Sequence, residues 1–140
     1  MIGLLAIVAA LSGPLPQDGP NTATVTYEVN FAPLKRAERD YADMGPAGPF
    51  YPAGASDNRK SGEAYLRCVA KTAGILEQCR VISENPSGFA FGEAAQVMAN
   101  RHRITAAGSP PPGETIRVRV PFDLHARAKI EPRRRGCIRL

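Results

Sequence analysis

The sequence predicts an α+β fold with β-β-α-β order, in which an antiparallel sheet carries one helix packed on one face. Three patterns predict it: a strand–turn–strand segment, an apolar stripe at helical spacing, and a later segment of alternating apolar and polar residues. The chain has 140 residues, 44% of them hydrophobic, which suits one domain of ordinary size. Few aromatic residues and no Trp predict a modest core.

The first segment, residues 1–13, is expected to be a signal peptide. Residues 2–11 form an unbroken run of apolar and small residues that ends at Ser12-Gly13-Pro14. That length suits the apolar region of an export signal and is about half of what a membrane-spanning helix needs. No Lys or Arg precedes the run. A start site placed slightly too late and a buried helix therefore stay open as alternatives.

Residues 14–49 are predicted to be an N-terminal extension with a strand at 24–31. The extension begins with a spacer rich in Pro, Gly, Asn and Asp, a composition typical of flexible segments. In the strand, polar residues alternate with the apolar Val25, Tyr27, Val29 and Phe31. This alternation indicates a half-buried strand, but it does not reveal whether the strand joins the main sheet.

The best-patterned segment is a hairpin over residues 62–83 with a turn that contains Gly74. Pairing the strands around a four-residue turn places Cys68 opposite Cys79, with both on the core face. Opposed positions on neighbouring strands lie within reach of a disulfide. Closing a loop of about twelve residues is expected to add roughly 2–3 kcal/mol of stability. The same pairing predicts the opposed pairs Leu66–Val81 and Ala64–Ser83.

Two other interpretations of the cysteine pair stay open. Reduced core cysteines would fit a cytosolic protein. Metal binding is the weaker alternative, because the spacing matches no zinc motif and neither His102 nor His125 is placed to complete a site. No C-x-x-C is present, so a bond here is expected to be structural. Cys137 is left over, either free or paired with another chain, which leaves a homodimer open.

A helix of about three turns is expected after the break at residues 84–88. Its apolar stripe consists of Phe91, Ala94, Ala95, Met98 and His102. His102 is therefore expected to be partly buried on this helix, whereas His125 is expected at the surface.

A third strand is predicted at residues 115–122, where apolar and polar residues alternate again. Pro121 cannot donate a hydrogen bond to a neighbouring strand, and Pro in a sheet is typical of an edge. Arg117 and Arg119 are charges of the kind that exposed edges carry. The sequence therefore predicts that this strand lies at an edge of the sheet.

The net charge of +5 comes largely from a basic tail, residues 125–140. No zinc-finger, RNP or helix-turn-helix pattern accompanies the charge, so no specific nucleic-acid binding is expected. The tail is instead expected to contact an acidic surface, such as anionic lipid, a polyanion or a partner protein. The sequence has no catalytic triad, acid–base pair or phosphate-binding loop that would predict catalytic residues or a cofactor.

Several segments occur in a fixed order along the chain: Tyr51-Pro52-x-x-Ala55, Gly62-Glu63-Ala64-Tyr65-Leu66-Arg67-Cys68, Gly74-Ile75-Leu76-Glu77-Gln78-Cys79-Arg80-Val81-Ile82-Ser83-Glu84, Pro86-x-Gly88-Phe89-x-Phe91-Gly92-Glu93-Ala94-Ala95 and Val118-x-Val120-Pro121-Phe122. Together they resemble the TonB C-terminal domain, especially the small periplasmic TonB-like proteins with paired cysteines on the hairpin. The resemblance implies a domain over residues 50–124 and agrees with the β-β-α-β order predicted from the patterns.

TonB proteins transmit energy from an inner-membrane motor to outer-membrane transporters, and their C-terminal domain binds a transporter segment by strand addition. The resemblance therefore implies a non-enzymatic periplasmic binding module that engages an outer-membrane transporter or another envelope protein. It makes the third strand the docking edge, through Thr115, Ile116, Arg117, Val118, Arg119 and Val120.

The alternative function is a TonB-type energy transducer whose N-terminal segment is retained as an inner-membrane anchor facing the periplasm. A full TonB has a spanning anchor and a long Pro-rich spacer. Here the apolar segment is too short to span, and residues 13–50 are not uniformly Pro-rich. A small envelope enzyme is a third, less favoured function.

Overall fold

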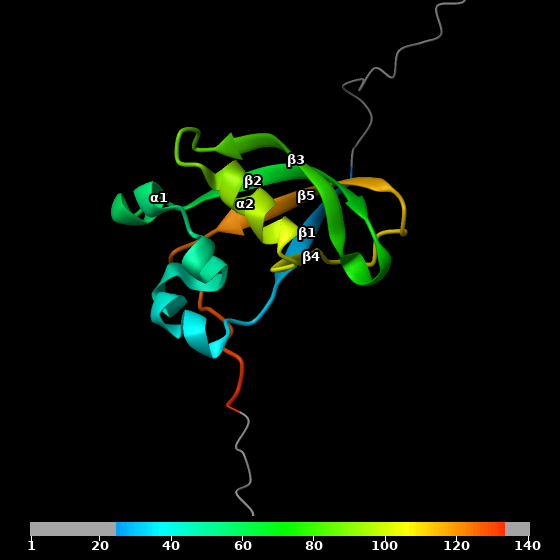
Figure 1. Cartoon of the computed structure of the whole chain (residues 1–140). Coiled ribbons are helices and arrows are strands. Elements are labelled where there is room, and N and C mark those ends of the chain that lie inside the picture. Colours follow the sequence, from blue (N-terminus) through cyan, green and yellow to red (C-terminus); the bar gives the residue numbers. More distant parts are fainter. Residues whose placement is uncertain (1–24, 134–140) are drawn as a thin grey trace, which may run out of the picture.

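Residues 25–133 are described by the structure, a computed structural model, which has an α+β fold (Figure 1). The elements follow in the order β1 (Thr26–Phe31), the 3-10 helix η1 (Arg36–Phe50), α1 (Ala53–Asp57), β2 (Gly62–Ala70), the short 3-10 helix η2 (Thr72–Gly74), β3 (Leu76–Asn85), α2 (Phe91–Asn100), β4 (Ile104–Ala106) and β5 (Thr115–Phe122). The strands form one five-stranded mixed sheet with the order β3-β2-β5-β1-β4. The expected signal peptide and Cys137 lie outside the described residues.

The predicted hairpin is confirmed, because β2 and β3 pair antiparallel through the turn of η2. Leu66 lies opposite Val81, as predicted. The predicted Ala64–Ser83 pair is wrong, since Ser83 lies opposite Tyr65. The reason is a bulge: the register slips by one residue between Tyr65 and Leu66, which leaves Ile82 as the extra residue of β3.

The prediction that residues 115–122 form an edge strand is wrong, because β5 lies in the middle of the sheet. It pairs antiparallel with β2 on one side and parallel with β1 on the other. The predicted docking edge is thus not an edge for any of Thr115, Ile116, Arg117, Val118, Arg119 and Val120. β1 pairs with β5 only from Arg117 to Arg119, so Pro121 lies beyond this pairing. Because β1 needs no backbone hydrogen bond from Pro121, the missing N–H of proline is tolerated on an interior strand.

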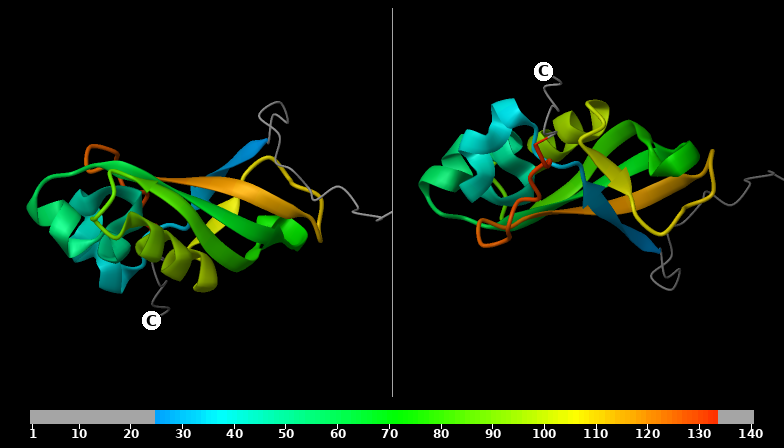
Figure 2. Two further views of the ribbon diagram at one scale, coloured as in Figure 1. Left: turned by 90° about the horizontal axis from the view of Figure 1, so that it is seen from above. Right: turned by 90° about the horizontal axis from the view of Figure 1, so that it is seen from below.

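The predicted helix α2 lies on one side of the curled sheet, and the described chain places no helix on the other side (Figure 2). It packs against β3 and β2. Phe91, its first residue, is fully buried, and its ring lies 5.0 Å from that of Phe122. The helix ends at Asn100, so the expected place of His102 is wrong: that residue is exposed and lies beyond the helix at φ 54°. His125 is exposed, as predicted.

Two strands extend the sheet beyond the predicted core. β1 inserts between β5 and β4, and its alternating side chains pack against the core. β4 is only three residues long and follows α2 directly. Among residues 25–133, no helix is long and apolar enough to cross a membrane.

Candidate binding surface

The face of the sheet that α2 leaves uncovered is built by alternate residues of the strands. Leu66 and Cys68 of β2 are buried in the core, so Arg67 between them points to the uncovered face. By the same alternation, Arg117 lies between the buried Ile116 and Val118 of β5. We call this surface the open face. It carries four arginines and an aromatic residue that contacts one of them: Arg67, Arg80, Arg117, Arg119 and Tyr65.

Three of these arginines form a row across the strands. Arg67 lies directly opposite Arg80 of β3 on one side and directly opposite Arg117 of β5 on the other. Neighbouring strands lie about 4.8 Å apart, so the row is on the order of 10 Å long. Like charges in opposed positions destabilise a sheet. We call this row, in which three positively charged side chains occupy opposed positions, the arginine row.

Arg117 is held in the row by an aromatic contact. Its guanidinium carbon lies 4.6 Å from the centroid of the Tyr65 ring, a cation–π distance. Its Nε is buried and has no hydrogen-bond partner among the residues that the structure describes. Within the described residues, no carboxylate lies within ion-pair distance of Arg117 or Arg80. The two ends of the row therefore receive no neutralising charge from this part of the chain.

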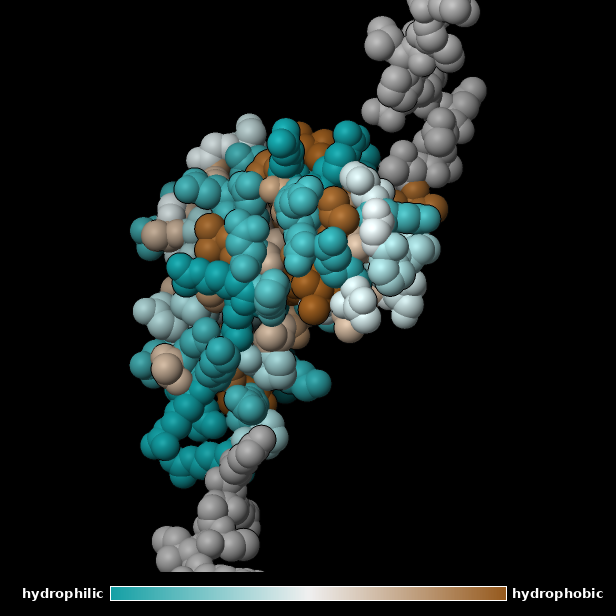
Figure 3. All heavy atoms as spheres, turned by 45° about the vertical axis from the view of Figure 1, so that its right-hand side comes forward, coloured by the Kyte–Doolittle hydropathy of each residue, from teal (hydrophilic) through white to brown (hydrophobic). Residues whose placement is uncertain are grey.

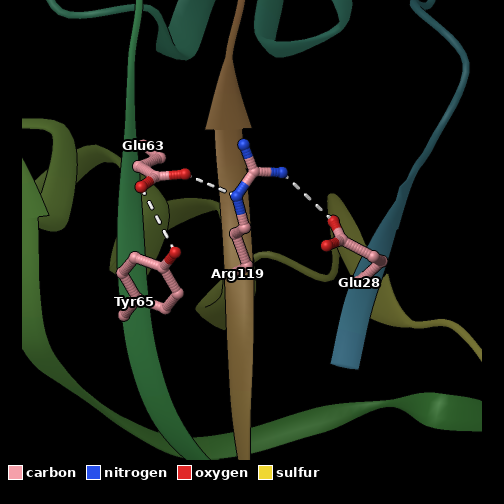
Figure 4. Close-up of polar contacts among 4 residues, drawn as sticks. All are labelled: Glu28, Glu63, Tyr65 and Arg119. Atoms are coloured by element: carbon pink, nitrogen blue, oxygen red, sulfur yellow. Dashed lines mark hydrogen bonds and ion pairs between the residues drawn. The ribbon is translucent and has the colours of Figure 1, made fainter. Parts of the chain in front are cut away.

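Arg119, the fourth arginine of the open face, differs from Arg80 and Arg117 because it lies between two carboxylates (Figure 4). Arg119 Nε donates a hydrogen bond to the carboxylate of Glu63 on β2, and its NH1 lies 3.4 Å from Glu28 Oε2 on β1. The Tyr65 hydroxyl donates to the other oxygen of Glu63 at 3.2 Å. The hydrogen bond to Glu63 raises the pKa of Arg119 above its usual value, although partial burial works against it. Arg119 thus links three strands and is locally neutralised.

The outer edge of β3 borders the open face. The strand has ten residues, and only β2 lies beside it in the described sheet. The run Arg80 to Ser83 is exposed throughout, including Val81 at 43% and Ile82 at 42%. The carbonyl of Cys79 accepts a hydrogen bond from Gln96 of α2 at 2.9 Å. The part of this edge that α2 leaves accessible therefore begins near Arg80.

The disulfide between Cys68 and Cys79 lies behind this edge. The predicted bond is confirmed, with both cysteines on the core face and Cα atoms 4.1 Å apart. It fixes β3 to β2 at the position next to Arg80. The edge strand is therefore held covalently at the end where the accessible part begins.

Titratable residues line a separate hollow near α1. Asp43, Asp57 and His125 lie there together with Ser56. The Ser56 hydroxyl donates to the carbonyl of Ala53, and in the described chain the His125 ring has no hydrogen-bonded carboxylate or hydroxyl. These groups therefore do not form a nucleophile–base–acid chain. Among residues 25–133, no group of His, Cys, Asp and Glu could hold a metal ion.

Sequence reasoning assigned no role to Arg80 and Arg67. The signal was present, because hairpin pairing already places the two side chains on the face opposite the cysteines. That Arg117 lies beside them could not be predicted from the hairpin, because it depends on the pairing of β5 with β2. The prediction placed Arg117 on the edge of the sheet, whereas it lies on an interior strand.

No protein-family model matches the chain, and no curated protein matches its sequence. The fold and the surface define the class: a disulfide-linked α+β domain with a long edge strand beside a basic sheet face. On the side shown in Figure 3, most of the described surface is hydrophilic and the hydrophobic residues form separate small patches. That side therefore has no single continuous apolar face among the described residues.

Proposed function

We propose that this chain is a non-enzymatic binding module that takes up an extended segment of a partner protein along the outer edge of β3. The observation that carries the proposal is that, within residues 25–133, no strand pairs with the outer side of this ten-residue strand. In strand addition, backbone N–H and C=O groups of the edge supply affinity, and alternate side chains supply specificity. The exposed Val81 and Ile82 offer apolar surface to such a segment.

A family placement belongs to the same proposal. The chain order β2-β3-α2-β5, with antiparallel pairing of β2 with β3 and β5 and with α2 on one face, is the β-β-α-β arrangement that the resemblance to the TonB C-terminal domain implies. This agreement supports a TonB-like domain to which β1 and β4 are additions. The proposed docking edge is that of β3 and not that of β5, because β1 pairs with the side of β5 that β2 leaves free.

The proposed location is the periplasm, and the proposed partner is an outer-membrane transporter or another envelope protein. Disulfides persist in oxidising compartments and are rare in the cytosol. The bond between Cys68 and Cys79 therefore supports export.

Peptide binding to the oxidised full chain tests the function. The probes are ten-residue peptides from outer-membrane transporters, and the readouts are calorimetry and amide chemical shifts. We expect saturable binding, with shift changes concentrated at residues 80–85. N-methylation at alternate peptide positions should abolish binding, because it removes the N–H groups that face β3.

The matched control is N-methylation at the intervening positions, whose N–H groups face away from β3 and whose loss should be tolerated. Shift changes centred elsewhere, or equal effects of the two methylation patterns, would refute docking at this edge. Absence of binding across the whole peptide set, with the protein folded by circular dichroism, would refute the binding function itself.

A further inference from the structure

The arginine row leads to the edge that the proposed docking uses. Its members lie on β5, β2 and β3, and Arg80 occupies the outermost strand. At the other end, Arg117 is followed by Thr26 of β1, which carries no charge. The arginine row therefore ends beside a neutral residue on the β1 side, whereas within the described residues no strand lies beyond its end on the β3 side.

Acidic residues near the row already have partners. On β3, Glu77 pairs with Lys71 at 3.7 Å, and Glu84 accepts a hydrogen bond from the backbone N–H of Gly92 at 2.9 Å. Glu63 and Glu28 are bound to Arg119, as described above. Opposite charges in opposed strand positions stabilise a sheet, whereas like charges destabilise it. A carboxylate placed beyond Arg80 would thus stabilise the added strand through its attraction to Arg80.

We propose that the segment bound along β3 is acidic on one face and carries an Asp or Glu directly opposite Arg80. This inference rests on the proposed function and names the chemistry of its partner. A strand added beyond β3 would lie about 4.8 Å away, and its residue opposite Arg80 would point to the same open face. The Cβ atoms of such a pair lie about 4.5–5.5 Å apart, within reach of an ion pair.

The neighbouring positions of the bound segment should be apolar. Strand side chains alternate between faces, so residues on either side of the acidic one point to the helix side of the sheet. On that side they meet Val81, which is 43% exposed beside Gly92 of α2. The segment is therefore expected to alternate acidic and apolar residues.

The charges around the row favour a peptide over a polyanion. Arg119, in the next row along the strands, is flanked by the carboxylates of Glu63 and Glu28 (Figure 4). Glu77, opposite Val69, lies on the other side of the row. A phosphate chain that runs across the open face would meet these carboxylates. A single acidic position in an added strand would meet only Arg80.

Three peptides with the same alternating apolar residues test the inference, carrying Asp, Asn or Lys at the alternate positions. We expect the Asp peptide to bind the oxidised full chain about tenfold more tightly than the Asn peptide, and the Lys peptide to bind most weakly. Arg80→Gln should reduce the affinity for the Asp peptide to that for the Asn peptide. Arg36→Gln is the control, since it removes the same charge from an exposed residue of η1.

A charge reversal provides a rescue. Arg80→Glu should bind the Lys peptide more tightly than the Asp peptide, and circular dichroism checks that each variant is folded. Equal affinities for all three peptides, with shift changes still at β3, would overturn the acidic preference and leave strand addition standing. Binding of a single-stranded oligonucleotide or anionic vesicles that depends on Arg80, without a preference among the peptides, would overturn it in favour of a polyanion.

Discussion

Cys68 of β2 and Cys79 of β3 are joined by a disulfide at the point where the two strands lose their register. Arg67 lies opposite Arg80 and Val69 lies opposite Glu77, so one residue of β2 faces two of β3. The extra residue, Gln78, adopts φ 52°. A bulge disrupts the ladder of hydrogen bonds. The disulfide therefore secures an edge strand at one of the two places where a register shift interrupts its pairing with β2.

Removing this bond should lower the free energy of unfolding. The cysteines are 11 residues apart in sequence, and opening a loop of that size is expected to cost about 2–3 kcal/mol. The variant is Cys68→Ala with Cys79→Ala in a Cys137→Ser background, measured by urea denaturation. The background protein is the control, and dithiothreitol should lower its stability toward that of the variant. A background protein equally stable with and without reductant would contradict the expectation.

Gly74 should be intolerant of a side chain. Its φ is +73°, and a Cβ there would lie 2.4 Å from the carbonyl oxygen of Ala106 on β4. Gly74→Ala should therefore destabilise the protein by more than the roughly 1–3 kcal/mol of backbone strain alone. Gly113→Ala separates the backbone strain from the clash with β4, because Gly113 also has a positive φ, +90°, but a Cβ there would meet no atom within 4 Å. Equal losses for the two variants in thermal denaturation would show that the contact with β4 contributes nothing.

The hairpin and α2 could be predicted because their signals are local. The turn at Gly74 and the apolar stripe from Phe91 to Met98 each lie within a few residues of the structure that they specify. The order of the strands could not be predicted in this way. Glu28 and Arg119 meet although 91 residues separate them, and no local pattern encodes that meeting.

The lack of long-range information in local patterns also explains why β5 was wrongly predicted to be an edge strand. Arg117 and Arg119 are charged because they point to the open face, not because β5 lacks a neighbour. Alternation alone cannot distinguish an edge strand from an interior strand with one solvated face. β4 was not predicted because three residues are too few to show a period.

Tyr51 should make stability depend on alkaline pH. Its ring packs edge-on against Phe91 and Phe122, and its hydroxyl donates to the carbonyl of Lys60. Burial raises the pKa of Tyr51 above its ordinary value. Above about pH 10 the unfolded chain loses this proton first, so the contribution of Tyr51 is complete below that pH and is lost as the pH rises through the folded pKa.

Urea denaturation between pH 7 and 11, in the Cys137→Ser background, measures this effect. Tyr51→Phe should be less stable at pH 7 by about 1 kcal/mol, because it loses a hydrogen bond. Its stability should fall less steeply above pH 10 than that of the background protein. Tyr41→Phe is the control, since Tyr41 is 42% exposed and its variant should keep the steeper fall. Identical slopes for all three proteins would argue against a buried, protonated Tyr51.

The ion pair of Arg103 and Glu38 should contribute more to stability than the pair of Arg119 and Glu28. Arg103 follows α2, its side chain is 9% exposed, and its NH2 lies 2.7 Å from Glu38 Oε2 on η1. Glu38→Gln leaves this cation buried without its carboxylate, which is expected to cost about 3–5 kcal/mol. Glu28→Gln is the matched substitution in a pair whose acid is 60% exposed, and it should cost roughly 0–1 kcal/mol.

A double variant identifies the cause of the larger loss. If the unpaired buried charge is responsible, Arg103→Met in the Glu38→Gln protein should recover part of the lost stability, because an apolar side chain of similar length replaces the cation. Urea denaturation of the two single variants and the double variant gives the coupling energy. A Glu38→Gln loss no larger than that of Glu28→Gln would mean that water reaches Arg103 and solvates it. The attachment of η1 to the end of α2 would then depend on packing rather than on this pair.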